Sequence, residues 1–484
     1  MQRQERAPLW EALVAHVRHG YAAFHVPGHK GGRGAPPELG AAWGRPVFEY
    51  DLTELPGLDN LHAPAGAVRA AQELAAELYG ARATFFLVGG TTAGLVAAVL
   101  AATRPGQRIL LPRHAHRSLL AATILADLEP VFYPVEVDKE WGLPGGWDET
   151  AVEALIRQTP GAAALVLVHP TYHGLVGPAR ELIAAAQAAG LTVIADEAHG
   201  PHFYLHPELP PGALTLGADL AAQSTHKLLG SLTQSSWLHL GGGRVPAAAV
   251  AEALRWVESS SPSYLLLASL DLARRQAARN GRAAWQRALE LARTVRSGAA
   301  RLPGLACLEA AGWPGVTGQD LCKLTVRVSG LGLTGREAAC YLRRAHGIQA
   351  ELADLRTVLF VLTPADGEKD GERLLTALAA LARERRGEKA RVGELPELPR
   401  PVQRLRPRAA AFAPKAYLPW RAARGRVAAR AVVPYPPGVP LAWPGEELTP
   451  EVLAAGEALQ AAGTELHGLT PGEGGEPLVA VVEE

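Results

Sequence analysis

Apolar and polar positions alternate along residues 66–226 in a pattern that predicts strands and helices in turn. Short apolar runs such as AALVLV at 163–168 are typical of buried parallel strands. Longer runs with apolar residues every three or four positions predict amphipathic helices. We expect strands at 84–87, 108–111, 131–135, 163–168, 191–195 and 219–223, and helices at 67–79, 91–103, 118–128, 149–158 and 179–189. This alternation predicts an α/β fold with a mostly parallel sheet and helices on both faces.

The rest of the chain differs in pattern and predicts further segments. Residues 1–65 carry one short amphipathic helix at 9–18 and then a loop rich in Gly and Pro, which is typical of an arm over a neighbouring surface. One long helix is expected at 265–302. We therefore predict an N-terminal arm (1–65), a major domain (66–300), a small α+β domain (301–386), a charged, Pro-rich linker (387–407) and a C-terminal domain (408–484).

Composition narrows the class of protein. The 484 residues include 48 Lys+Arg and 48 Asp+Glu, so charge does not favour nucleic acid or an anionic membrane as a partner. Cys307, Cys322 and Cys340 lack the spacing of metal ligands, and no metal is expected. The N-terminus does not resemble a signal peptide, and no apolar run reaches membrane-spanning length. A cytoplasmic protein is therefore expected.

A single lysine, Lys227, lies in a stretch that is uncharged after Asp219 and mostly apolar or small. A desolvated lysine loses its proton more readily and becomes a nucleophilic amine, as a Schiff base requires. Ser224, Thr225 and His226 directly precede it and are suited to holding a phosphate. By itself, such a stretch more often marks a lysine that reaches solvent from a strand end, so its interpretation depends on other segments.

Three further polar segments each follow a predicted strand. GGTTAG at 89–94 offers N–H groups and hydroxyls to a phosphate, or Thr91 or Thr92 simply caps the next helix. The segment matches neither GxGxxG nor GxxxxGK[ST]. Asp196 brings a carboxylate to a buried strand end, where a protonated pyridine nitrogen or the next turn would satisfy it. His116 could stack on a flat cofactor, although a lone histidine is more often structural.

Together these segments supply what pyridoxal 5′-phosphate (PLP) requires. Ligands of parallel sheets bind outside the carboxyl ends of the strands, where all of these segments are expected. They offer a lysine for the Schiff base, an acid for the ring nitrogen and donors for the phosphate. The sequence therefore predicts a PLP site.

The chain resembles the Orn/Lys/Arg decarboxylase family, which has the aspartate aminotransferase fold (fold type I), and in particular its shorter form. The motifs that carry this resemblance span nearly the whole chain: PGHKGG (27–32), DLTELPGLDNL (51–61), GGTTAG, RHAHRS (113–118), HPTYHG (169–174), ADEAHGPH (195–202), STHKLLGSLTQ (224–234), SSSPSYLLLASLD (259–271) and PYPPGVPLAWPGE (434–446). RHAHRS stands where the family more usually has RNxHKS, which puts the finer contacts around His116 in doubt.

The resemblance implies a role for each matched residue. Lys227 would form the Schiff base, Asp196 would bind the pyridine nitrogen, and His116 would stack on the ring. The remaining cofactor contacts would come from Thr91, Thr92, Ser224 and His226 at the phosphate and from Thr171 and His199 near the ring. Residues 259–263 of a partner subunit would help to hold the phosphate. Candidates for contacting the distal cation of the substrate are Glu351, Asp354 and Glu446.

The implied reaction is α-decarboxylation of a basic amino acid. Arginine, giving agmatine for polyamine biosynthesis, is favoured because the chain resembles the biosynthetic arginine decarboxylases; lysine and ornithine remain open. Lys227 or His226 would return a proton to Cα. An aminotransferase would need an arginine clamp in the small domain, and no matching motif is found. A cofactor-binding regulator would carry a DNA-binding domain and a basic face. The N-terminal segment is too short for such a domain and the overall charge is balanced, so this alternative is disfavoured. Because sites of this fold usually form between subunits, a homodimer or larger homo-oligomer is expected.

Overall fold

The computed structural model describes residues 2–385, 396–435, 438–472 and 475–483. It divides into two compact units, each built from separate stretches of the chain. The first comprises Met1–Ala102, Leu167–His169 and Gly190–Ala284, and the second comprises Thr103–Val166, Pro170–Ala189 and Trp285–Glu484. The five predicted segments stay a prediction, and the linker expected at 387–407 lies partly outside the described residues.

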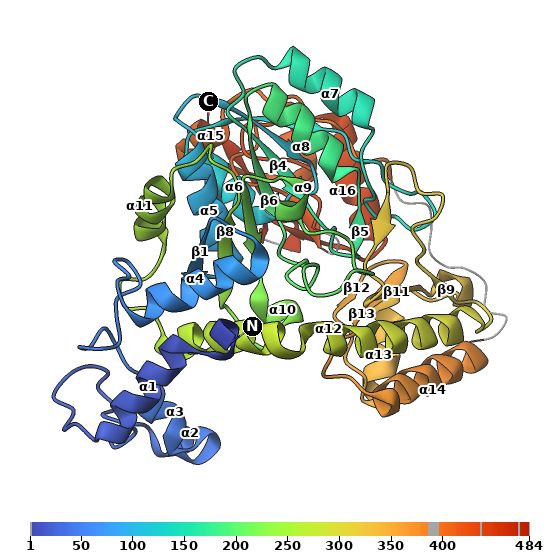
Figure 1. Cartoon of the computed structure of the whole chain (residues 1–484). Coiled ribbons are helices and arrows are strands. Elements are labelled where there is room, and N and C mark those ends of the chain that lie inside the picture. Colours follow the sequence, from blue (N-terminus) through green and yellow to red (C-terminus); the bar gives the residue numbers. More distant parts are fainter. Residues whose placement is uncertain (1, 386–395, 436–437, 473–474, 484) are drawn as a thin grey trace. The chain divides into compact units, whose positions relative to one another are not determined.

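Four strands of the first unit pair in the order β1-β8-β7-β6. Figure 1 labels three of them, β1, β8 and β6. β6 and β7 are parallel, whereas β8 pairs antiparallel with both β7 and β1. Every residue of β6, β7 and β8 is buried, as expected of strands covered on both faces. The strands are β1 (Ala83–Leu87), β6 (Thr192–Asp196), β7 (Leu220–Gln223) and β8 (Ser236–Leu240).

Helices of the first unit follow the predicted pattern in part. The predicted helix at 67–79 is confirmed, and the one predicted at 91–103 begins one residue earlier. The N-terminal loop prediction is wrong at two places, because α2 and α3 form there, each beginning at a proline or just before one. The helices are η1 (Gln2–Glu5), α1 (Pro8–His19), α2 (Pro37–Trp43), α3 (Arg45–Tyr50), α4 (Ala67–Tyr79), α5 (Gly90–Ala102), α9 (Ala213–Leu216), α10 (Thr225–Leu228), α11 (Ala247–Val257) and the first part of α12 (Tyr264–Ala300).

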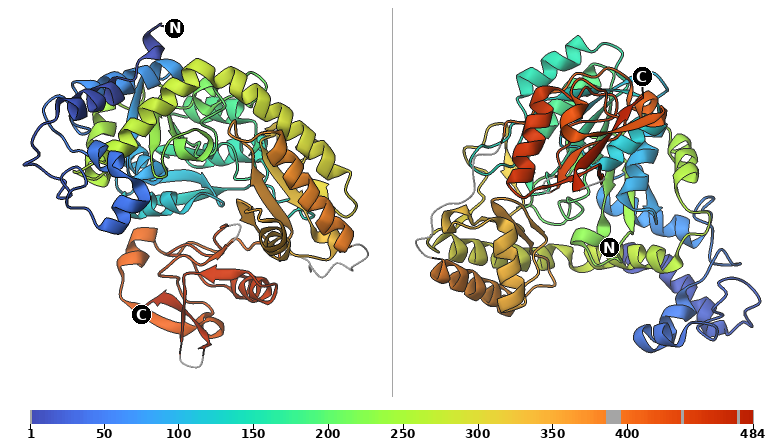
Figure 2. Two further views of the ribbon diagram at one scale, coloured as in Figure 1. Left: turned by 90° about the horizontal axis from the view of Figure 1, so that it is seen from below. Right: turned by 180° about the vertical axis from the view of Figure 1, so that it is seen from behind.

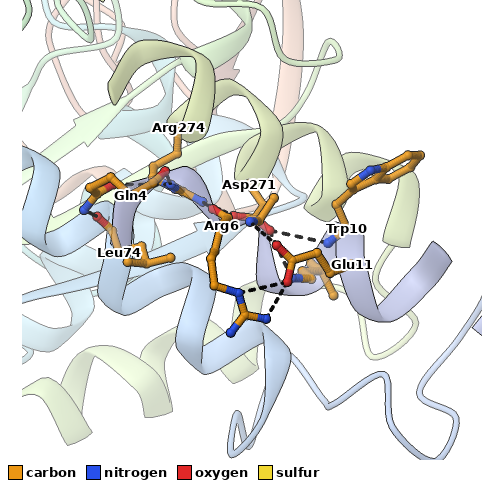
Figure 3. Close-up of polar contacts among 9 residues, drawn as sticks. Gln4, Arg6, Trp10, Glu11, Leu74, Asp271 and Arg274 are labelled. Carbon is orange, nitrogen blue, oxygen red and sulfur yellow. Dashed lines mark hydrogen bonds and ion pairs between the residues drawn. The ribbon is translucent and has the colours of Figure 1, made fainter. Parts of the chain in front are cut away.

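A buried ion pair on α12 fixes the N-terminal helix (Figure 3). Arg274 and Asp271 are both 0% exposed, and Arg274 Nη2 lies 2.7 Å from Asp271 Oδ1. Arg274 also donates to the carbonyl oxygens of Gln4 and Arg6. Asp271 Oδ2 accepts the N–H of Leu9 at 3.0 Å, in the first turn of α1, where no residue of the helix itself can accept it. The pair therefore caps α1 from a distant helix.

Strands of the second unit pair in the order β4-β2-β3, all parallel. Here β2 spans Arg108–Pro112, β3 spans Glu129–Tyr133, and β4 (Ala164–Val168) contributes its first three residues to this unit. A second sheet, β12-β13-β11-β9, is antiparallel throughout. Two amphipathic helices, α13 (Gly335–His346) and α14 (Glu368–Glu384), belong to the same part of the chain. The strands of this sheet are β9 (Ala306–Cys307), β11 (Lys323–Arg327), β12 (Leu352–Ala353) and β13 (Thr357–Val361).

The C-terminal segment, from residue 408 onward and orange to red in both views of Figure 2, carries its own antiparallel pairs, β14-β18-β17 and β15-β16. They lie around a cluster of buried apolar residues that includes Trp420, Leu453 and Val481. The remaining elements of the unit are α6 (Arg117–Leu125), α7 (Glu149–Gln158), β5 (Leu175–Val176), α8 (Ala179–Ala188), β10 (Gly318–Gln319), η2 (Ser329–Leu331), α13 (Gly335–His346), α14 (Glu368–Glu384), α15 (Pro407–Phe412), β14 (Lys415–Pro419), η3 (Trp420–Ala423), β15 (Val433–Tyr435), α16 (Pro450–Ala461), β16 (Glu465–His467), β17 (Leu469–Pro471) and β18 (Pro477–Val482).

None of the helices in the described ranges combines the length and the apolar character that crossing a membrane requires. Within the same part of the chain, the His, Cys, Asp and Glu side chains form no group of three or more that could hold a metal ion.

Candidate active site

Lys227 lies in α10, a single helical turn that directly follows β7. Its amine is partly buried, and Lys227 Nζ lies 2.9 Å from His199 Nε2. His199 is 7% exposed and belongs to the turn after β6. The structure thus brings together two residues that are 28 positions apart in sequence. An imidazole at hydrogen-bond distance can hold the amine in one direction.

Asp196 is the last residue of β6 and is 6% exposed. One of its oxygens accepts the N–H of Ala198 at 3.2 Å. β6 and β7 are parallel, and Asp196 pairs with Ala222, two residues before Ser224. Asp196 and the turn that carries Lys227 therefore follow neighbouring strands at the same edge of the sheet.

Hydroxyl groups gather at the start of α5. Thr91 Oγ1 lies 2.7 Å from Ser224 Oγ and donates to Ser236 Oγ at 3.0 Å. These buried contacts join the GGTTAG segment to the turn before Lys227. Thr92, the next residue, is exposed in the first turn of the helix. Since the first N–H groups of a helix have no acceptor within it, this turn is suited to an anion.

His226 and Thr225 complete the turn. His226 Nδ1 lies 2.8 Å from the carbonyl oxygen of Ser235, so Nδ1 is the donor and Nε2 is left as the acceptor in the neutral ring. Burial, and the nearby charge of Lys227, lower the pKa of His226 and favour that neutral form. Thr225 Oγ1 is buried without a hydrogen-bond partner among the described residues, which is uncommon unless another group is to be received.

The residues present fit PLP. A lysine amine held by an imidazole, a buried carboxylate at the neighbouring strand end, and hydroxyls at a helix N-terminus match the aldehyde, ring nitrogen and phosphate of that cofactor. The unsatisfied Thr225 hydroxyl within the same turn agrees with this match.

A buried polar network that the sequence pattern did not predict lies next to Asp196. Glu197 is 0% exposed and accepts hydrogen bonds from Tyr204 Oη, Ala213 N and Gln223 Nε2 at 2.7–2.9 Å. Burial raises the pKa of Glu197 to about 7, against the effect of these donors, and the charge of Asp196 adds to the rise. Gln223 Oε1 in turn lies 3.1 Å from Nε2 of His239. The only signal in the sequence was a second acid directly after Asp196.

His116 and Thr171 belong to the second unit. His116 is exposed and caps α6, with its Nδ1 accepting the N–H of Ser118 at 3.2 Å. This hydrogen bond to the first turn of α6 fixes the orientation of the imidazole ring. Thr171 is buried, and its hydroxyl accepts the N–H of Leu175 at 3.1 Å.

The three acids proposed for the substrate cation differ in environment. Glu351 is exposed and accepts a hydrogen bond from Tyr172 Oη at 2.6 Å. Asp354 is buried and accepts from the backbone of Arg356 and from both the backbone and the hydroxyl of Thr357. Such local bonds favour a structural role for Asp354.

Glu446 is 1% exposed and forms a two-pronged ion pair with Arg113, and it also accepts the N–H of Trp443. Because its own neighbours already engage both oxygens, Glu446 is better suited to holding the C-terminal segment than to meeting a substrate.

Two family models match the chain. The model described as Orn/Lys/Arg decarboxylase, major domain, covers residues 7–370, and the model of the C-terminal domain covers residues 408–473. The chain belongs to the Orn/Lys/Arg decarboxylase family. The predictions of family and of a decarboxylase as the class of enzyme are confirmed.

Relatives of this decarboxylase agree with that assignment. It is 37% identical over 454 residues to the arginine decarboxylase of Bacillus subtilis, covering 93% of this chain and 92% of the relative. Its structure resembles that of the Francisella novicida lysine decarboxylase LdcF with a TM-score of 0.88, at 19% identity, over 98% of this chain and 81% of the other. A structure described as SPT with PLP matches 65% of this chain and 76% of its own, with a TM-score of 0.52 and 16% identity. The predicted fold class is therefore confirmed.

Proposed function

We propose that this chain is a PLP-dependent decarboxylase that converts arginine to agmatine and CO2. The observation that carries the proposal is the amine of Lys227, held 2.9 Å from His199 at the edge of the sheet where Asp196 ends β6. The choice of arginine rests on the arginine decarboxylase of B. subtilis, to which the chain is 37% identical over 93% of its length.

When bound, PLP supplies an electron-accepting ring that stabilises the negative charge left on Cα after CO2 departs. Asp196 would keep the ring nitrogen protonated, since a buried carboxylate favours a positive partner. The phosphate would be held by Thr92, Ser224 and the start of α5. Thr91 would orient the Ser224 hydroxyl through the hydrogen bond between their side chains. His116 would stack on the ring and Thr171 would lie near it.

The lysine turn would handle the protons. His199 would orient the Lys227 amine, and Lys227 or His226 would hold the proton that Cα receives. Because the pKa of His226 is lowered, its ring is neutral at neutral pH and carries no extra proton to donate. Lys227 is therefore the better candidate for the group that donates a proton to Cα.

Glu351 is the acid that we propose for the distal cation of the substrate. It is exposed, and the hydrogen bond from Tyr172 Oη fixes one of its oxygens while the other stays open to a guanidinium. Lysine and ornithine are the alternative substrates, because the matching family model is described by all three basic amino acids. We further propose a cytoplasmic homodimer or larger homo-oligomer. Phe24, which is 96% exposed, and Tyr21, which is 60% exposed, give the N-terminal arm an apolar surface for such an assembly.

The test is a side-by-side assay of the purified protein with PLP and arginine, lysine or ornithine, measuring CO2 and the amine formed. We expect agmatine to form fastest. Lys227→Ala should abolish turnover and the absorbance band of the lysine–cofactor Schiff base, whereas Lys139→Ala, which changes an exposed lysine, should affect neither. Faster release of cadaverine or putrescine would refute arginine as the substrate, and normal activity of Lys227→Ala would refute the whole assignment.

A further inference from the structure

The peptide between Val88 and Gly89, directly before α5, is held from two sides. The carboxylate of Glu258 accepts the N–H of Gly89 at 2.9 and 3.1 Å and the N–H of Val88 at 3.3 Å. From the other side, Gln234 Nε2 donates to the carbonyl oxygen of Val88 at 2.7 Å. The two side chains come from positions 170 and 146 residues away along the chain. They form what we call the loop clamp.

Both side chains of the loop clamp belong to residues in conformations or environments that are unfavourable in free energy. Glu258 is only 9% exposed, and burial raises the pKa of its carboxyl group against the effect of the two N–H donors. Gln234 has a φ of +83°, a left-handed backbone that residues other than glycine rarely adopt. Strained backbone conformations and buried acids with a shifted pKa occur most often at functional sites.

Gly89 is fitted to the clamp. A Cβ atom at this position would lie 3.2 Å from both oxygens of Glu258 and 2.9 Å from Cβ of Ala93. A larger residue would therefore push the carboxylate away from the N–H groups that it accepts. The glycine, the acid and the amide together leave the loop little freedom.

The clamp fixes the direction in which α5 begins. Glu258 accepts the two N–H groups that directly precede the helix, and this fixes the backbone at the helix start. The N–H groups of the first turn, which contains Thr91 and Thr92, are therefore held in one orientation. Gln234 belongs to the same segment as Lys227 and therefore ties the lysine segment to this loop. We propose that Glu258 and Gln234 are positioning residues that orient the start of α5 toward the phosphate of PLP. This inference rests on the proposed function.

Charge and geometry act in opposite directions at Glu258. A carboxylate near the helix start would repel a phosphate, so its removal would tighten binding if charge mattered more than position. Gln234 is uncharged, and replacing it changes geometry alone. Gln234→Gly also suits the positive φ, so it removes the side chain without new strain.

The test compares the apoprotein of the parent, Glu258→Gln and Gln234→Gly, with Glu252→Gln as a matched control, because Glu252 is exposed on α11, the helix that ends directly before Glu258. Each protein is titrated with PLP and with pyridoxal, which lacks the phosphate. We expect the Kd for PLP to rise about tenfold in both clamp variants. The Kd for pyridoxal should stay within about twofold of the parent in both, and the control should match the parent with both ligands.

Three results would overturn the inference. Gln234→Gly could bind PLP like the parent, Glu258→Gln could bind it as tightly or more tightly, or both ligands could weaken equally, as a merely structural role would produce. Thermal melting of each apoprotein shows that it is folded at the titration temperature. If the parent takes up neither ligand, the proposed function fails and this inference with it; if the parent binds PLP and the variants are unaffected, this inference alone fails.

Discussion

Replacing Arg274 with methionine should release the N-terminal helix from the first unit. Arg274 and Asp271 form a fully buried ion pair, and breaking such a pair by removing one partner costs about 3–5 kcal/mol. The substitution also removes the donor to the carbonyl oxygens of Gln4 and Arg6 (Figure 3). Among the described residues, it leaves the buried Asp271 with the N–H groups of Leu9 and Trp10, in the first turn of α1, as its partners.

That cost is comparable to what holds the helix in place. Leu9 and Leu13 are the buried residues of α1, both 0% exposed, and each contributes about 2 kcal/mol by burial. Loss of about 3–5 kcal/mol therefore offsets most of the apolar contribution, and α1 should open locally before the rest of the unit unfolds.

The assay is hydrogen exchange of the peptide that contains α1, with limited trypsin digestion as a second measurement. A loss of about 3 kcal/mol should speed exchange by roughly a hundredfold. Arg279→Met is the matched control: it removes another arginine of α12 that contacts the N-terminus, but in an exposed pair with Glu5, so it should cost less than about 1 kcal/mol. Unchanged exchange in Arg274→Met, or equal effects of the two variants, would refute the reasoning.

Three other changes have defined outcomes. The pKa of Glu197 is raised from 4.5 to about 7, so its contribution to stability is full below pH 4.5 and is lost as the pH rises to about 7; the melting temperature of the parent should fall relative to that of Glu197→Gln over this range, and parallel curves would contradict it. Gly335→Ala would place a Cβ atom 2.0 Å from the carbonyl oxygen of Thr357. Urea unfolding should show that the free energy of unfolding falls by about 1–3 kcal/mol or more. Arg113→Met should cost about 3–5 kcal/mol by leaving the buried Glu446 carboxylate without its cation, with the N–H of Trp443 still bound to it; thermal unfolding of the second unit would reveal the loss, and an unchanged transition would contradict it.

Local pattern was a good guide to elements with strong periodicity. The amphipathic helix expected at 9–18 became α1, because its apolar positions recur on one face and Leu9 and Leu13 are buried there. The apolar pattern did not predict β8, since its sequence SWLHL places a serine and a histidine inside the protein. His239 is tolerated there because it bonds to Thr84 and Gln223 on neighbouring strands. Only the partners make the residue compatible with burial.

The sequence by itself determined the alternation of strands and helices and the family, and it singled out Lys227 as the candidate for the Schiff base, because these depend on local spacing and on motifs that can be read in one stretch. Only the tertiary structure decided which polar groups meet. Glu258 and Gly89 are 169 residues apart, and Asp271 and Leu9 are 262 apart. The worth of such contacts depends on burial and on distances of a few ångströms, and neither is written in the order of the residues. The acids that a motif proposed for the substrate were likewise separated by their neighbours: Glu351 stays exposed, whereas Glu446 is paired with Arg113.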